Sequence, residues 1–225
     1  MRDKGRDLME TIIYIFLTIS YICIFIWDVM ISRKDGLFKV TNLLLLVIFG
    51  LIYDNFIIAL GKYIGEGHLL ETLSTLRYWF HALFTPTLIL FAWAICLHLG
   101  LRWAKKTYWK ILFFTLTIGL ISYELLASIR GLQLEPKWEQ GVLTYQNVQS
   151  SNPIMVIIIT IVLALIGFLL LRKFHFPWLF VGVLLMVVGS LLNMWIKFSP
   201  MMNLFELLLI VSLLLTKRFQ VQFNN

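Results

Sequence analysis

Long hydrophobic runs, separated by short polar or glycine-containing stretches, cover almost the whole chain. Seven of them come close to or exceed the length of about 20 residues that an α-helix needs to cross a bilayer. The runs lie at about 9–31, 39–60, 74–99, 108–130, 153–172, 176–196 and 201–217. This pattern predicts an all-α, polytopic membrane bundle of seven transmembrane helices. Residues 1–225 are expected to form a single integral membrane domain.

Glycine and proline mark the breaks between these runs. Gly36, Gly131, Pro153 and Pro200 lie at or between run ends, where helix breakers are expected. Pro86 lies inside the third run and should kink it, because proline cannot donate the helical hydrogen bond. The sixth and seventh runs are separated only by a short KFSP segment, which predicts a tight helical hairpin.

Composition supports the membrane class and argues against a nucleic-acid partner. Hydrophobic residues make up 60% of the chain and charged residues 14%, whereas soluble domains are nearer half apolar and a quarter charged. The net charge is +7, but the basic residues fall in short clusters between apolar runs rather than in a patch among aromatics. We therefore expect a multi-pass protein of the cell membrane that contacts lipids and binds no nucleic acid.

The distribution of lysine and arginine predicts the orientation of the bundle. Basic residues concentrate in the loops of one side, which the positive-inside rule places in the cytoplasm. These residues are Arg33, Lys34, Lys39, Arg102, Lys105, Lys106, Lys110, Arg172, Lys173, Lys217 and Arg218. The basic residues of the N-terminal tail count the other way. The prediction is an N-terminus outside and a cytoplasmic C-terminus.

With that orientation, costly polar side chains of five runs fall at a similar depth in the outer half of the membrane. An ionised side chain at mid-membrane costs roughly 2.5–3.5 kcal/mol on insertion scales, so these groups should face one another or a wet cavity. Those proposed as catalytic are Asp54, Arg77, His81 and Glu124. Those proposed to bind a substrate are Asn55, Tyr123, Asn193, Asn203 and Glu206. The sequence thus predicts an outward-facing intramembrane polar site.

The residue types in this cluster suggest acid–base chemistry on a lipid-like or amphipathic substrate. His81 would be the general acid or base, with Asp54 or Glu124 setting its tautomer. Arg77 would hold a phosphate or carboxylate. No serine or cysteine lies in a nucleophile-elbow context, so the nucleophile is not identified. A metal bound by His81, Asp54 and Glu124 is a further option, but one histidine is a thin ligand set for zinc.

Two other functional classes remain open on the sequence. Intramembrane carboxylates and a histidine also suit a proton-linked transporter of small solutes. A non-catalytic sensor, immunity or assembly protein fits the same composition. Asp54 and Arg77 could equally be a structural ion pair that locks two helices. The longest loop, residues 131–152, could cover the mouth of the cavity or lie on the lipid headgroups.

Overall fold

The computed structural model describes residues 2–36, 38–139, 141–148, 153–196, 198 and 200–223, with side chains from Met9 onward. Helices dominate it. They are α1 (Arg2–Asp35), a 3₁₀ turn (Val40–Asn42), α2 (Leu43–Ile64), α3 (His68–Phe84), α4 (Thr87–His98), α5 (Thr107–Glu124), a π-helical turn (Leu125–Ile129), α6 (Ile154–Phe174), α7 (Trp178–Trp195) and α8 (Met201–Phe223). Strands β1 (Leu134–Glu139) and β2 (Val142–Asn147) form an antiparallel hairpin.

Each of the seven apolar runs contains helix, with one interruption. The third run is divided into α3 and α4 at Thr85–Pro86, as the proline predicts, because Pro86 has no N–H to donate to the preceding turn. The hairpin β1–β2 lies in the long loop, for which the sequence analysis predicted no strands. The bundle is therefore all-α except for one small two-stranded sheet.

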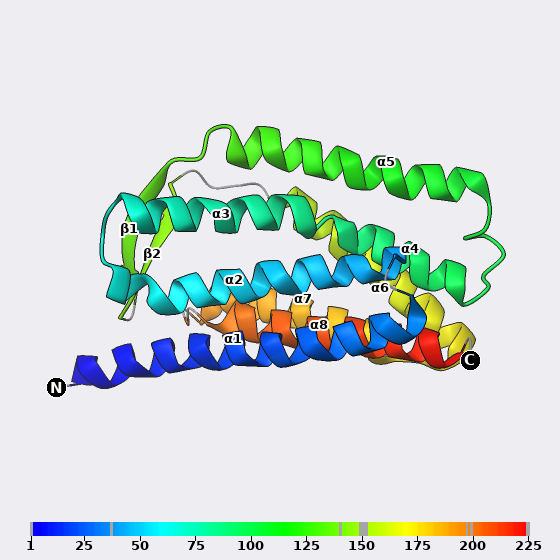
Figure 1. Cartoon of the computed structure of the whole chain (residues 1–225), viewed down its shortest axis with the longest axis horizontal. Coiled ribbons are helices and arrows are strands. Elements are labelled where there is room, and N and C mark those ends of the chain that lie inside the picture. Colours follow the sequence, from blue (N-terminus) through cyan, green and yellow to red (C-terminus); the bar gives the residue numbers. More distant parts are fainter. Residues whose placement is uncertain are drawn as a thin grey trace.

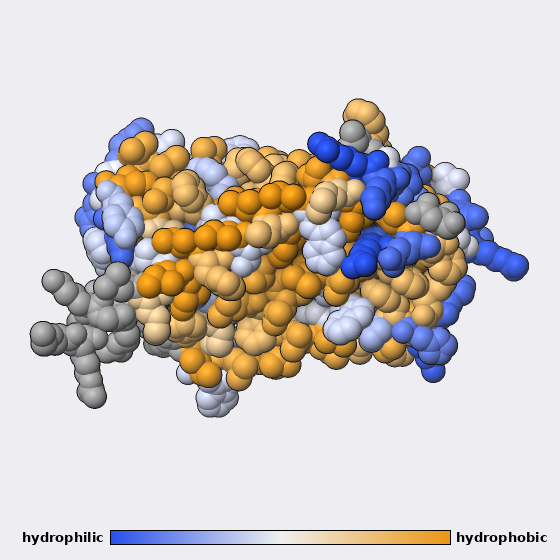
Figure 2. Space-filling model, turned by 60° about the horizontal axis from the view of Figure 1, so that its bottom comes forward, coloured by the Kyte–Doolittle hydropathy of each residue, from blue (hydrophilic) through white to orange (hydrophobic). Residues whose placement is uncertain are grey.

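Within the part of the chain that the structure describes, six helical segments are long and apolar enough to cross a membrane. They are Met9–Asp35, Val40–Ile64, His68–His98, Thr107–Ile129, Ile154–Phe174 and Trp178–Trp195. Helix α8 has 23 residues, about 34 Å at the usual rise, but Glu206, Lys217 and Arg218 interrupt its apolar sequence. On the face shown in Figure 2, hydrophobic residues cover the middle of the molecule and polar residues gather at its two ends. The protein is a helical bundle of the membrane type.

The helices run side by side along one axis (Figure 1). Helix α1 packs on α2 and α8, α7 packs between α6 and α8, and α5 packs on α3 and α4. The close contact of α7 with α8 depends on Gly182, because a Cβ there would meet the Ser212 side chain. Helix α1 begins at the end of the bundle that carries the hairpin, and α8 ends at the opposite end (Figure 1).

Helix α4 forms the centre of the apolar core in the half of the bundle away from the hairpin. Eight consecutive side chains, from Ile89 to Cys96, are buried, and most of them are fully inaccessible. This continuous burial matches a helix with neighbours on every side, here α2, α5, α6 and α8. The core is therefore closed in this half.

The hairpin is fixed onto the ends of α2 and α3 by apolar packing and by hydrogen bonds. Leu143 and Tyr145 of β2 pack with Ile57 of α2 and Leu70 of α3. The Tyr145 hydroxyl accepts a hydrogen bond from the backbone N–H of Gly67 at 3.0 Å. In a strand, alternate residues face opposite sides. The other face of β2, which carries Val142, Thr144 and Gln146, is therefore directed away from this packing.

A fully buried ion pair joins α1 to α8. The Lys217 Nζ donates to Asp28 Oδ1 at 2.5 Å and to Ser32 Oγ at 2.9 Å, and both charged side chains have no exposed surface. Lys217 was expected among the basic residues of the cytoplasmic side, at the end of the last helix. It is instead turned into the bundle, where Asp28 compensates its charge.

Substitution of Gly61 should loosen the hairpin. A Cβ at this position of α2 would overlap the backbone carbonyl of Leu143. Gly61→Ala is therefore expected to destabilise the docked hairpin by about 1–3 kcal/mol and to raise hydrogen–deuterium exchange of residues 142–147. The matched control is Gly119→Ala in α5, where a Cβ meets open space and should leave the exchange of the hairpin unchanged. Unaltered exchange in Gly61→Ala would contradict the docking.

Removal of one partner of the buried pair should cost far more than removal of both. Lys217→Met leaves the Asp28 carboxylate uncompensated and should lower the free energy of unfolding by about 3–5 kcal/mol. The double variant Asp28→Leu/Lys217→Met should recover most of this loss. Denaturant unfolding in detergent micelles measures both. The neighbouring Arg218 is exposed, so Arg218→Met should have little effect; equal losses for Lys217→Met and Arg218→Met would rule out a buried pair.

Candidate functional site

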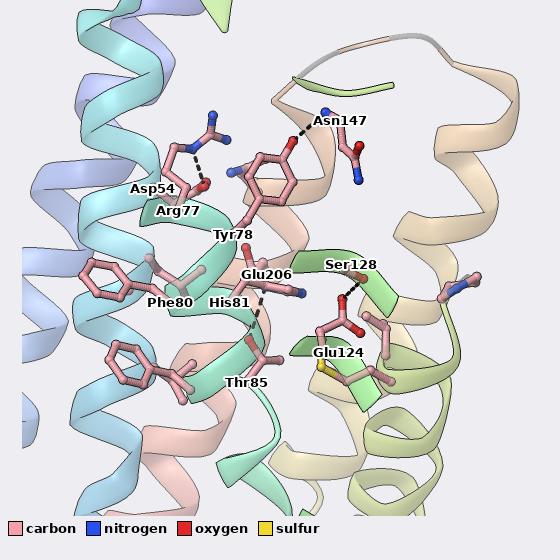
Figure 3. Close-up of a pocket in the computed structure, with 18 residues that line it drawn as sticks. Asp54, Arg77, Tyr78, Phe80, His81, Thr85, Glu124, Ser128, Asn147 and Glu206 are labelled. Atoms are coloured by element: carbon pink, nitrogen blue, oxygen red, sulfur yellow. Dashed lines mark hydrogen bonds and ion pairs between the residues drawn. The ribbon is translucent and has the colours of Figure 1, made fainter. Parts of the chain in front are cut away.

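A polar cavity of about 390 Å³ lies between α2, α3, α5, α6 and α8 at the hairpin end of the bundle. Its lining includes all four residues proposed as catalytic, which the structure therefore brings together around one space (Figure 3). They are Asp54, Arg77, His81 and Glu124. The remaining polar lining consists of Tyr78, Thr85, Ser128, Asn147, Asn203 and Glu206.

Asp54 of α2 and Arg77 of α3 form an ion pair at the edge of this cavity. The Arg77 Nε donates to Asp54 Oδ1 at 2.7 Å, and the two side chains retain 14% and 26% of their exposed surface. Only Nε is used in this bond. The terminal guanidinium nitrogens make no hydrogen bond to the described part of the chain, so their four N–H donors remain for an anionic ligand.

His81 lies one helical turn after Arg77 and opens onto the cavity. Its Nδ1 is 3.2 Å from the hydroxyl of Thr85, on the same face of α3. A hydroxyl can donate to Nδ1 or accept from it, so Thr85 holds one ring nitrogen and leaves Nε2 for a ligand. The expectation that Asp54 or Glu124 hydrogen-bonds His81 is wrong, since Asp54 bonds Arg77 and Glu124 bonds Ser128.

Glu124 enters the cavity from the end of α5. Its carboxylate accepts a hydrogen bond from the Ser128 hydroxyl at 2.7 Å, and both residues are only 8% exposed. Ser128 belongs to the π-helical turn Leu125–Ile129, which widens the helix directly after Glu124. Such turns are rare and are often found at functional sites. Glu124 and Ser128 thus lie on the α5 side of the cavity, and His81 on the α3 side (Figure 3).

Glu206 of α8 is the third carboxyl group of the cavity. It makes no hydrogen bond or ion pair with the residues that the structure describes, and it lines the same cavity as His81 (Figure 3). Tyr78 is held at the hairpin side of the cavity, where its hydroxyl accepts the backbone N–H of Asn147 at 3.0 Å. The cavity thus combines one paired carboxylate, two further carboxyls, one guanidinium and one imidazole.

The other four residues proposed to bind a substrate lie in different places. Asn203 borders the cavity and donates through Nδ2 to Asn55 Oδ1 at 3.2 Å. Asn55 is fully buried and supports Asn203 without lining the cavity. Tyr123 lies outside the lining, one residue away from the face of α5 that carries Glu124. Asn193 lines a different cavity.

A second cavity of about 530 Å³ adjoins the first beneath the hairpin. Asp54, Arg77 and Asn203 line both, so the ion pair lies on the boundary between the two spaces. The further wall of the second cavity comes from Tyr14 of α1, from Val142, Thr144 and Gln146 of β2, and from Asn193 at the end of α7. The long loop therefore covers polar space, as one of the two sequence-based expectations had it.

The side chains do not converge as a metal centre. Among the described residues, no group of three or more His, Cys, Asp or Glu side chains is arranged to hold a metal ion. The option of a metal on His81, Asp54 and Glu124 thus receives no support from the geometry.

Several elements of the site have no clear signal in the sequence. The polar contributions of Tyr78 and Asn147 depend on how the hairpin docks, and an isolated tyrosine in an apolar run is usually an interfacial or packing residue. Ser128 has a signal, because it lies four residues after Glu124 and therefore on the same helical face.

No family model matches the chain, and a search of curated proteins found no match.

Proposed function

We propose that this protein is a membrane-embedded enzyme that acts on an anionic, amphipathic lipid by acid–base chemistry in the Asp54–Arg77–His81–Glu124 cavity. The observation that carries the proposal is that His81, a free guanidinium edge and two carboxyl groups share one cavity. Seven spans with the N-terminus outside would place this cavity in the outer half of the cell membrane. An odd number of spans agrees with α1 beginning and α8 ending at opposite ends (Figure 1).

Arg77 is the anion-binding residue of the proposed site. Asp54 holds its Nε, which fixes the plane of the guanidinium and leaves the terminal nitrogens directed to a ligand. Arginine binds phosphate or carboxylate through paired N–H donors of this kind. A negatively charged headgroup in the cavity would therefore be held beside His81.

His81 is the proton-transfer residue. Thr85 occupies Nδ1, so Nε2 is the atom that takes or gives a proton at the substrate. Glu124 with Ser128 forms the opposite wall, and Glu206 adds a further carboxyl group to the lining of the same cavity. Two acidic groups of different surroundings in the cavity that holds the imidazole provide the acid and base partners that such a step requires.

The substrate is proposed to be amphipathic because the cavity is bordered by apolar side chains and by the loosely packed pair α5 and α6. Phe80, Phe84, Met155 and Val156 line it beside the polar residues. The same two helices enclose an apolar cavity of about 410 Å³ further along, between Trp109 and Leu116 of α5 and Val162 and Leu169 of α6. A headgroup in the polar cavity would thus have a path for its acyl chain between α5 and α6.

The transporter alternative is less well supported by the packing. A carrier needs a route from the cavity to the other side of the membrane. Here the half of the bundle beyond the cavity is filled by the fully buried side chains of α4, among them Ile89, Phe91 and Ile95. A cavity that ends against a closed core suits a reaction site.

Loss of the imidazole should abolish turnover without unfolding the protein. The purified protein in nanodiscs is incubated with a total membrane lipid extract, and products are identified by mass spectrometry. General acid–base catalysis contributes typically 10²–10⁴-fold, so His81→Gln should lower product formation by about that factor. Arg77→Gln should mainly raise the substrate concentration required for half-maximal rate.

The matched control is His68→Gln. His68 begins the same helix but lies outside both cavities, so its loss should leave turnover unchanged. Thermal unfolding of all variants shows that the fold is kept. Product formation by His81→Gln at the rate of the unaltered protein, or the absence of any product from the extract, would overturn the proposal.

A further inference from the structure

The second cavity differs from the first in its balance of charge. Its charged lining residues are Asp54, Arg77 and Glu139. Asp54 and Arg77 are paired with each other, and Glu139 is paired with Lys137 at 2.6 Å. Each charge that the described residues bring to this wall therefore has a counter-charge beside it. The first cavity, in contrast, contains Glu124 and Glu206 with no cationic partner among the described residues.

Hydroxyl and amide groups make up the rest of the polar wall. Thr144 accepts a hydrogen bond from Gln146 Nε2 and keeps its own hydroxyl proton for a ligand. Asn203 uses Nδ2 to bind Asn55 and keeps its amide oxygen. Asn193 makes no hydrogen bond with the described residues, so its amide offers both a donor and an acceptor.

The strand β2 explains why these groups face the cavity. Leu143 and Tyr145 point into the small core with α2 and α3, so the alternate residues Val142, Thr144 and Gln146 must line the opposite side. Gln146 is itself held by Glu139 and Lys137, which fixes the direction of Thr144 beside it. The polar wall is therefore built from a docked and internally bonded hairpin.

We infer that the cavity bounded by Thr144, Asn193 and Asn203 binds an uncharged, hydroxyl-rich molecule, such as a sugar or polyol. Adjacent donors and acceptors match hydroxyl groups, each of which donates and accepts at once. Ile58, Val142 and Phe198 supply apolar surface for the carbon face of such a molecule. A space of about 530 Å³ lies within the usual range of small-molecule sites. The inference does not depend on chemistry at His81.

Three sugar probes that share the same ring and differ in charge test this inference. Glucose, glucuronate and, at mildly acidic pH, glucosamine present the same hydroxyl groups with no charge, a negative charge and a positive charge. Saturation-transfer difference NMR with the full-length protein in nanodiscs gives the dissociation constant of each. We expect glucose to bind at least about tenfold more tightly than glucosamine, because no unpaired carboxylate of the described wall compensates the ammonium group. Glucose should also bind more tightly than glucuronate, because Asp54 already neutralises the charge of Arg77, the one cation in the described lining.

Two variants locate the binding in this cavity. Thr144→Val and Asn193→Ala each remove hydrogen-bonding groups without filling the space, and each should weaken glucose binding about three- to tenfold. Thr72→Val is the matched control, since Thr72 is exposed on α3 and lines neither cavity. The inference is overturned if none of the rings binds, if a charged ring binds best, or if both variants bind glucose as tightly as the control.

Discussion

The ion pair between Asp54 and Arg77 is the constraint on which the rest of the candidate site depends. It joins α2 to α3 at the depth where the bundle opens, and it lies on the boundary between the two polar cavities. Neither charge could face lipid at acceptable cost, so the pair obliges α2 and α3 to present these faces to polar space. The pairing also leaves His81, one turn further along α3, directed into the same space.

A comparison with the fully buried pair of Asp28 and Lys217 shows why the pair of Asp54 and Arg77 suggests a function. Asp28 and Lys217 are fully inaccessible, and Ser32 supplies a further hydrogen bond, so the pair has no surface left for a ligand. Its role is to connect α1 and α8 inside the bundle. Asp54 and Arg77 keep part of their surface, and Arg77 keeps unused donors. Of these two ion pairs, only Asp54 and Arg77 retain accessible surface through which a ligand could be bound.

Much of this arrangement can be predicted from the sequence, because every polar side chain inside a bilayer costs free energy unless it faces another polar group or water. The apolar runs predict the helices, and Pro86 predicts the break between α3 and α4. Similar depth predicts that Asp54, Arg77, His81 and Glu124 lie together. Periodicity predicts that Thr85 shares a helical face with His81 and Ser128 with Glu124, but it does not show that each pair is hydrogen-bonded, which depends on small differences in distance. The hairpin was missed because its strands are short and its packing partners lie on other helices.

The two halves of the bundle thus differ in packing: one has a closed apolar core, and the other contains the polar cavities. Away from the hairpin, the buried side chains of α4 fill the centre of the bundle, so this half provides stability. Near the hairpin, the polar side chains prevent the same dense packing, because carboxylates and a guanidinium need hydrogen-bonding partners or water. The docked strand β2 then covers this open end without filling it. A membrane bundle that needed only to be stable would not require a polar cavity at one end. The proposed ligand accounts for the presence of His81 in this cavity and for that of Glu206, which has no hydrogen-bond or ion-pair partner among the described residues.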